Sequence, residues 1–127
     1  MRMWFVDPET MCDKHLLGEH YECHVALGAI VKDTPQWRSF VRKGLILPGE
    51  LQNRHDELVT EMQKRGFVHK SPMCAPEWVS RFDRFFPECA DMAAHVLLFQ
   101  RCTTCRERFK KVRSLDDKDV LRLLGKG

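Results

Sequence analysis

Helix start and stop signals divide this chain into a series of helical segments. No stretch shows the alternation of apolar and polar residues that marks a half-buried strand. Asp7-Pro8-Glu9 is a helix start, because Asp caps free N–H groups, Pro fits the first turn and Glu suits the positive end of the helix dipole. We expect this helix to run to about Val31, before Asp33-Thr-Pro35 ends it. The pattern predicts an all-α fold.

The remaining signals predict two more long helices. One begins at Pro48 and is closed by Gly66, and the other begins at Pro87 and runs towards Phe109. We expect an extended arm at residues 3–6, a connector at 34–47, a break at Ser71-Pro72, short turns at 78–85 and a last short helix at 120–124. The prediction is therefore a compact single domain over residues 1–127, with three main helices and an extended N-terminal arm.

Composition excludes several classes of protein. Of the 127 residues 43% are hydrophobic, which is enough for a core, yet no apolar run approaches the ~18 residues of a membrane span. The first residues lack the apolar stretch of a signal peptide, so we expect a cytoplasmic protein. In that compartment the six cysteines are expected to be reduced thiols.

The first expected helix carries a candidate chemical site. Placed at about 100° per residue, His15, Glu19 and Glu22 lie together beside an apolar stripe. Carboxylates that repel one another at the edge of a core have raised pKa values, as acid–base catalysts need. The alternative is ordinary boundary charge, with His15 and Glu19 as a capping pair. The apolar stripe itself comprises Cys12, Leu16, Cys23, Leu27 and Ile30.

Two histidines on the opposite side of this helix have the spacing of metal ligands. His20 and His24 lie one turn apart, as two zinc ligands would. Tyr21 follows His20, however, so the His-Glu-x-x-His protease motif is absent. We therefore do not expect a protease-type metal site here.

A second incomplete metal pattern lies near the other end of the chain. Cys102-Thr-Thr-Cys105 is a lone Cys-x-x-Cys pair, and a closed zinc site needs two more ligands. Cys74 and Cys89 are the conceivable donors, although neither has a second Cys-x-x-Cys spacing. Two thiols on successive helical turns are the simpler interpretation, so we expect no bound metal and no cofactor.

Positive charge is concentrated in one segment although the net charge is only +3. Residues 101–113 contain six basic side chains against one acid, Glu107. We expect this segment to contact phosphates, through Arg101, Arg106 and Lys110 in particular. A solvated helix face is the alternative.

Two blocks of sequence resemble a known family. The first is Arg2-Met-Trp followed by His15-Leu-Leu-Gly-Glu19-His-Tyr-Glu22, and the second is Arg54-His-Asp-Glu-Leu continuing to Lys64-Arg-Gly-Phe. In order and spacing they are similar to the pyrimidine-dimer DNA glycosylases of the phage endonuclease V type. The resemblance covers about the first 72 residues well and the rest loosely. It implies a compact all-α domain whose N-terminus lies against the first helix.

The resemblance also implies an activity and its residues. Family members are DNA glycosylases and AP lyases whose nucleophile is the α-amine of the first residue, which aligns with Met1. Glu22 matches the catalytic carboxylate, Arg2 a residue beside the site, His15 a residue that orients it and Glu19 a supporting residue. The implied partner is double-stranded DNA with a damaged or modified base, bound by a monomer without a membrane or a cofactor.

The chain departs from the family pattern at two positions. Tyr21 and Val25 stand where the prototype has arginines flanking its catalytic Glu, and we expect His24 and the basic segment 101–113 to supply charge instead. Two alternatives stay open at this point. One is a non-catalytic nucleic-acid-binding module of the same fold, and the other is a small zinc-binding interaction protein built on Cys102 and Cys105.

Overall fold

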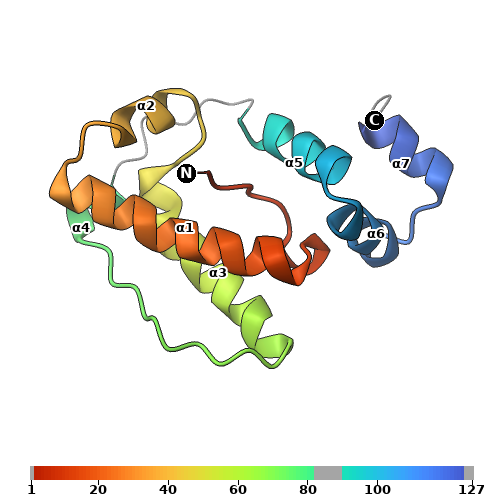
Figure 1. The fold of residues 1–127 in the computed structure, drawn as a ribbon, viewed down its shortest axis with the longest axis horizontal. Helices are drawn as coiled ribbons and strands as arrows, with labels where there is room; N and C mark the ends of the chain where they lie inside the picture. The colour runs from red at the N-terminus through yellow and green to blue at the C-terminus, as the bar shows by residue number, and fades with distance from the viewer. Residues whose placement is uncertain (1, 82–89, 125–127) are drawn as a thin grey trace.

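The computed structural model describes residues 2–81 and 90–124, and within them it contains helices and no strand (Figure 1). The all-α prediction is confirmed. None of the helices in this part of the chain has the length and apolar character needed to cross a bilayer. The elements are η1 (Pro8–Thr10), α1 (Asp13–Lys32), α2 (Trp37–Arg42), η2 (Pro48–Glu50), α3 (Leu51–Lys64), α4 (Glu77–Ser80), α5 (Ala90–Arg101), α6 (Thr103–Val112) and α7 (Asp117–Leu124), where η marks a 3-10 helix.

Helices α1 and α3 form the centre of the fold and cross one another in Figure 1. The buried side chains of α1 include Leu16 and Cys23, and those of α3 include Leu58 and Met62. Each fully buried Leu or Met side chain contributes about 1.5–3 kcal/mol to stability. The apolar stripe predicted for the first helix is the face that enters this core, except that Leu27 is only partly buried.

The first helix begins later than the sequence predicts. Asp7 caps the backbone N–H of Glu9 as expected, with an N···Oδ1 distance of 3.1 Å, but only the single turn η1 follows. Met11 and Cys12 are then extended, and α1 begins at Asp13. The interruption buries both extended side chains, since Met11 and Cys12 are buried members of the core.

The connector predicted at residues 34–47 contains a helix that the sequence analysis missed. Its helix, α2, buries Trp37 and Val41 one turn apart, and Trp37 donates a 3.0 Å hydrogen bond to Asp33. The second long helix is confirmed as η2 followed by α3. Helix α3 ends at Lys64, and Gly66, whose φ of +88° favours glycine, follows just after the helix end.

The single helix predicted from residue 87 to 109 is two helices. Cys102 is extended (φ −109°, ψ 107°) and separates α5 from α6, and its Sγ accepts a 3.4 Å hydrogen bond from the N–H of Cys105. This cap satisfies a free donor at the new helix start. The break folds the chain back so that the rings of Phe99 and Phe109 stack with centroids 4.4 Å apart.

Other predictions are met in part. Helix α4 overlaps the start of the short turns predicted at 78–85, but residues 82–85 and Pro87 lie outside the described residues. The last helix, α7, begins slightly before the predicted Val120.

Candidate functional site

The extended N-terminal arm lies alongside α1 and runs antiparallel to it (Figure 1). Its backbone is held at two consecutive residues. The N–H of Met3 donates to the carbonyl of Leu45 at 2.8 Å, and the N–H of Trp4 donates to Glu19 Oε1 at 2.9 Å. Met3 is also buried in the core. The position of the arm relative to α1 is therefore fixed close to its beginning.

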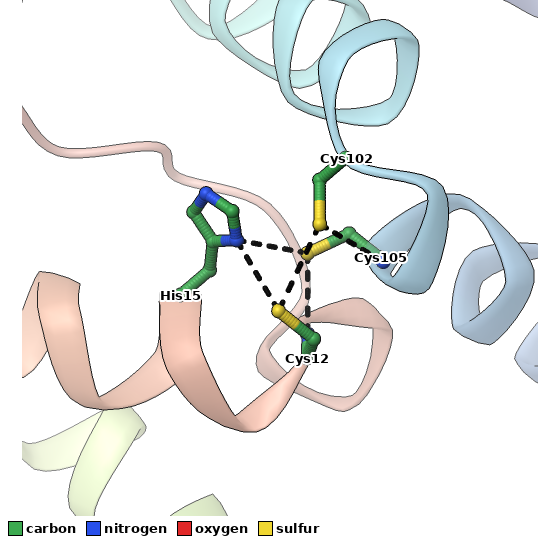
Figure 2. Close-up of side chains that lie close together, drawn as sticks. All are labelled: Cys12, His15, Cys102 and Cys105. Atoms are coloured by element: carbon green, nitrogen blue, oxygen red, sulfur yellow. Dashed lines mark hydrogen bonds between the residues drawn. The ribbon is translucent and has the colours of Figure 1, made fainter.

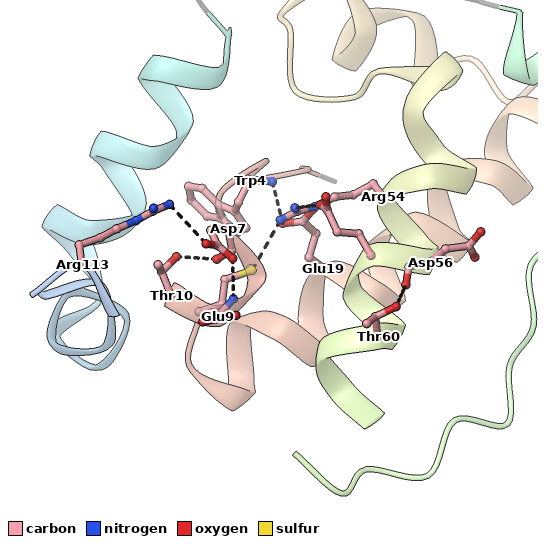
Figure 3. A network of polar contacts seen from close by, with 11 residues as sticks. Trp4, Asp7, Glu9, Thr10, Glu19, Arg54, Asp56, Thr60 and Arg113 are labelled. Atoms are coloured by element: carbon pink, nitrogen blue, oxygen red, sulfur yellow. Dashed lines mark hydrogen bonds and ion pairs between the residues drawn. The ribbon is translucent and has the colours of Figure 1, made fainter. Parts of the chain in front are cut away.

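A buried ion pair holds the carboxylate that receives the arm (Figure 3). Arg54 of α3 donates to both oxygens of Glu19, and the two residues are 5% and 2% exposed. Burial opposes the charge of Arg54, but Glu19 and Glu57 outweigh it and raise the pKa of the guanidinium. Glu19 thus links the arm, α1 and α3.

Glu22 lies one turn beyond Glu19 on α1. It is half-buried, and its carboxylate has no hydrogen bond or ion pair with any residue that the structure describes. Tyr21 beside it is 66% exposed. Met1, the predicted nucleophile, lies outside the described residues. The Glu22 carboxylate is therefore available to interact with a ligand, as far as the described residues are concerned.

Arg2, at the start of the arm, carries a guanidinium group with a nitrogen that is unpartnered within the described structure. Its guanidinium lies over the Trp4 ring, 4.5 Å from the centroid. Its Nε is buried and has no hydrogen-bond partner among the described residues. Burial, followed by repulsion from Arg101, lowers the pKa of Arg2. Two guanidinium groups from opposite ends of the chain thus act on one another here, as in a site for an anion.

Two of the three DNA contacts predicted in the basic segment are engaged within the protein. Arg106 donates to the carbonyls of Phe99 and Gln100 at the end of α5, at 3.3 and 3.5 Å. Lys110 lies 2.6 Å from Asp117. Arg101 is exposed and has no hydrogen bond or ion pair with the described part of the chain. Of the three predicted contacts, Arg101 is therefore the one with its charge fully available.

His15 belongs to a cluster with three thiols (Figure 2). The cluster comprises Cys12, His15, Cys102 and Cys105, and one ligand atom of each lies within 4.8 Å of the others. Burial, with repulsion from Lys14, lowers the pKa of the His15 imidazole, and burial raises the pKa of Cys105. The described cysteines are all free thiols, as predicted.

Of the two conceivable donors for Cys102 and Cys105, the structure tests only Cys74 and does not place it near them. Cys74 is exposed and not part of this cluster, while Cys89 lies outside the described residues. The nearby groups come instead from Cys12 and His15. Their Cys-x-x-His spacing repeats that of Cys102 and Cys105, and this was the available signal in the sequence.

A second cluster brings four imidazoles together. It comprises His20 and His24 of α1, His55 of α3 and His69, with one ring nitrogen of each within 4.8 Å of the others. Burial and the three neighbouring histidines lower the pKa of His20 to about 4. The side of α1 opposite to the apolar stripe is therefore not simply solvated, because α3 and the segment after it pack there. His55 and His69 were not singled out from the sequence.

Comparison with known proteins identifies one related group. The family model described as pyrimidine dimer DNA glycosylase matches residues 1–74. No curated protein and no solved structure matches the chain. The matched part contains the arm, α1 and α3, and therefore Arg2, Glu19 and Glu22.

Proposed function

Because this chain belongs to the pyrimidine dimer DNA glycosylase family, we propose that it excises a damaged or modified base from double-stranded DNA and then cleaves the strand as an AP lyase. The α-amine at the Met1 position is the nucleophile, and Glu22 is the catalytic carboxylate. The observation that carries this proposal is the hydrogen bond between the N–H of Trp4 and Glu19, which fixes the arm against the helix that bears Glu22.

The direction and reach of the arm support this pairing. From Glu19 to Glu22 the helix rises by about 4.5 Å. Because the arm is antiparallel to α1 (Figure 1), the chain before Trp4 continues in the direction of Glu22. Met1 is three residue steps before Trp4, and an extended chain of that length spans up to about 10 Å. A chain of that length is long enough to bring an α-amine to the Glu22 carboxylate.

The chemistry uses the properties of an α-amine. Its pKa of about 7.7–8.0 leaves a useful neutral fraction at pH 7, whereas lysine, at about 10.4, is almost fully protonated. The amine attacks C1′ of the sugar, the C1′–N bond breaks, and the base leaves with the bonding electrons. Opening of the ring gives a Schiff base, from which loss of a C2′ proton expels the 3′ phosphate. Glu22 stabilises the cationic sugar and transfers protons.

Phosphate binding is assigned to the guanidinium groups beside the arm. The buried Nε of Arg2 lacks a partner in the described structure, and Arg101 is exposed and close enough to lower the pKa of Arg2. A phosphate bound between them would satisfy that donor and screen the repulsion. This arrangement supplies positive charge next to the arm although Tyr21 and Val25 replace two arginines of the family prototype.

Borohydride trapping on duplex DNA with one abasic site tests the proposal. Protein with a free N-terminus is expected to form a covalent adduct that maps to Met1. N-terminal acetylation or an N-terminal tag is expected to abolish it, while the same tag at the C-terminus leaves it. An adduct that persists in the N-terminally tagged protein and maps to Lys14 or Lys32 would overturn the assignment of the amine.

The runner-up is a nucleic-acid-binding module that keeps the fold without the reaction. The absence of the two prototype arginines at Tyr21 and Val25 is the observation in its favour. The same experiment separates the two, because such a module binds the duplex and gives no adduct. A set of duplexes, each with one lesion and assayed for base release and nicking, then identifies the base that is excised.

A further inference from the structure

The first unexplained cluster is built from two helix starts that lie far apart in the sequence. Cys12 is the N-cap of α1 and Cys102 is the N-cap of α6. His15 and Cys105 each follow three residues later, one turn into the helix, and Figure 2 shows the four side chains converging from these two elements. The same Cys-x-x-ligand unit is thus used twice, as in structural zinc sites.

Three distances between ligand atoms of this cluster are close to those of a tetrahedral zinc site. Bonds of about 2.3 Å to sulfur and 2.0–2.1 Å to nitrogen give edges of about 3.8 Å between sulfurs and 3.6 Å between sulfur and nitrogen. The Sγ atoms of Cys12 and Cys102 lie 3.8 Å apart. Nδ1 of His15 lies 3.2 Å from Cys12 Sγ and 3.5 Å from Cys105 Sγ. Thiols are weak hydrogen-bond donors, so hydrogen bonding alone is a poor reason for gathering three of them.

Two backbone donors point at sulfur atoms of the cluster. The backbone N–H of Cys12 donates to Cys105 Sγ at 3.2 Å, and that of Cys105 donates to Cys102 Sγ at 3.4 Å. Both bonds lie at the positive ends of helices, where negative charge is stabilised. Three thiolates and one Zn²⁺ carry a net charge of about −1, which suits such a position.

We propose that Cys12, His15, Cys102 and Cys105 bind one structural zinc ion. All four positions are supplied by the protein, so no position is left open for a reacting group. The ion joins α1, inside the matched residues 1–74, to α6, outside them. It thereby holds Arg101, the residue before Cys102, beside the N-terminal arm.

Metal analysis and cobalt spectroscopy test this site in the full chain. Protein loaded with Co²⁺ is expected to show the ultraviolet charge-transfer band of cobalt–thiolate bonds. Cys105→Ser is expected to lose the band and one bound zinc per chain. Cys74→Ser, which changes an exposed cysteine outside the cluster, is expected to keep both. Wild-type protein that shows no thiolate band with saturating Co²⁺ would overturn the proposal.

A measurement on the wild-type protein covers the case in which Cys105→Ser fails to fold. Cys12, Cys102 and Cys105 are expected to resist alkylation in zinc-loaded protein and to react after a chelator is added, whereas Cys74 reacts in both states. Mass spectrometry assigns the modified residues. Equal reactivity of all four in the presence of zinc, or a disulfide among the three clustered cysteines, would overturn the proposal.

The histidine cluster carries a second inference from an independent observation. Nδ1 of His55 lies 3.0 Å from a carboxylate oxygen of Asp56, which requires a proton on Nδ1. With the proton on Nδ1, the Nε2 lone pair of His55 lies 3.2 Å from His20 Nε2, which can donate a hydrogen bond to it, and 3.2 Å from the carbonyl oxygen of Ser71, which cannot. A cation bound by Nε2 would offset the close approach of the Ser71 oxygen, and a carboxylate on the other ring nitrogen is typical of histidine ligands.

The neighbouring rings complete a set of four ligands. The Nε2 atoms of His24 and His69 are buried and have no hydrogen-bond partner among the described residues. Tetrahedral bonds of 2.0–2.1 Å to nitrogen give edges of about 3.3–3.4 Å, close to the 3.2 Å between His20 and His55. We infer that His20, His24, His55 and His69 bind one divalent transition-metal ion of the kind that neutral imidazoles prefer, such as Zn²⁺.

Equilibrium dialysis with Zn²⁺ tests the second site against the first. Wild-type protein is expected to bind two ions per chain, and His69→Gln and Cys105→Ser one each. In the cobalt form, His69→Gln is expected to keep the thiolate band, which shows that the loss is confined to the histidines. A wild-type protein whose only bound ion gives the thiolate band, or a stoichiometry unchanged by His69→Gln, would overturn this inference.

Discussion

Glu22 is the carboxylate on which the proposed chemistry depends. Glu22→Gln keeps the shape of the side chain but removes the charge that would stabilise the cationic sugar. We expect the rate of base excision to fall by about 10²-fold or more. The affinity for duplex DNA should be nearly unchanged, because the loss of a negative charge does not weaken phosphate contacts. Single-turnover excision and fluorescence anisotropy measure the two effects separately.

Asp13→Asn is the matched control for this substitution. Asp13 lies on the same helix, is exposed and pairs with Arg65 at the surface at 3.0 Å. Removing its charge should leave excision within about twofold of wild type, since surface ion pairs contribute only about 0–1 kcal/mol. An unchanged excision rate in Glu22→Gln would exclude Glu22 as the catalytic carboxylate.

At the scale of elements, the ion pair between Glu19 and Arg54 decides how the arm, α1 and α3 fit together. Arg54→Ala leaves the Glu19 carboxylate buried with the Trp4 N–H as its remaining hydrogen-bond donor among the described residues. Breaking a buried pair in this way lowers the free energy of unfolding by about 3–5 kcal/mol. Urea denaturation followed by circular dichroism measures the loss.

An exposed arginine of the same fold provides the comparison. Arg81 of α4 pairs with Glu77, and both side chains are 76% exposed. Arg81→Ala should therefore change the free energy of unfolding by only about 0–1 kcal/mol. If Arg54→Ala were as mild as Arg81→Ala, the buried pair would not be what fixes the arm to α1.

At the scale of the whole molecule, the basic residues predict how DNA binding responds to salt. The logarithm of the affinity should fall linearly with the logarithm of salt concentration, with a slope of about −0.9 per neutralised phosphate. Arg101→Ala should make the slope less steep by about that amount, because its charge is not used within the described structure. Arg122→Ala, which removes an arginine paired with Asp119 on α7, should leave the slope unchanged. A flat response in the wild type would argue against phosphate contacts.

The sequence by itself determined the helical class and much of the family core. The cap at Asp7, the helix starting at Pro48 and its end just before Gly66 are all encoded by neighbouring residues, and all appear in the structure. The blocks that contain Glu22 and Arg54 were sufficient to identify the family, which the match over residues 1–74 confirms. Such features can be predicted from the sequence because capping, turn geometry and amphipathic spacing depend on interactions between residues that are only a few positions apart.

Only the tertiary structure decided which distant side chains meet. Glu19 and Arg54 are 35 positions apart, and Cys12 and Cys102 are 90 positions apart. The helix break at Cys102 was also decided by the tertiary structure, because it allows α6 to pack against η1 and bring its thiols to the start of α1. The repeated Cys-x-x-ligand spacing marks candidate ligands locally, but which segments meet follows from how whole helices pack. The two clusters of possible metal ligands therefore became visible only when the helices were assembled.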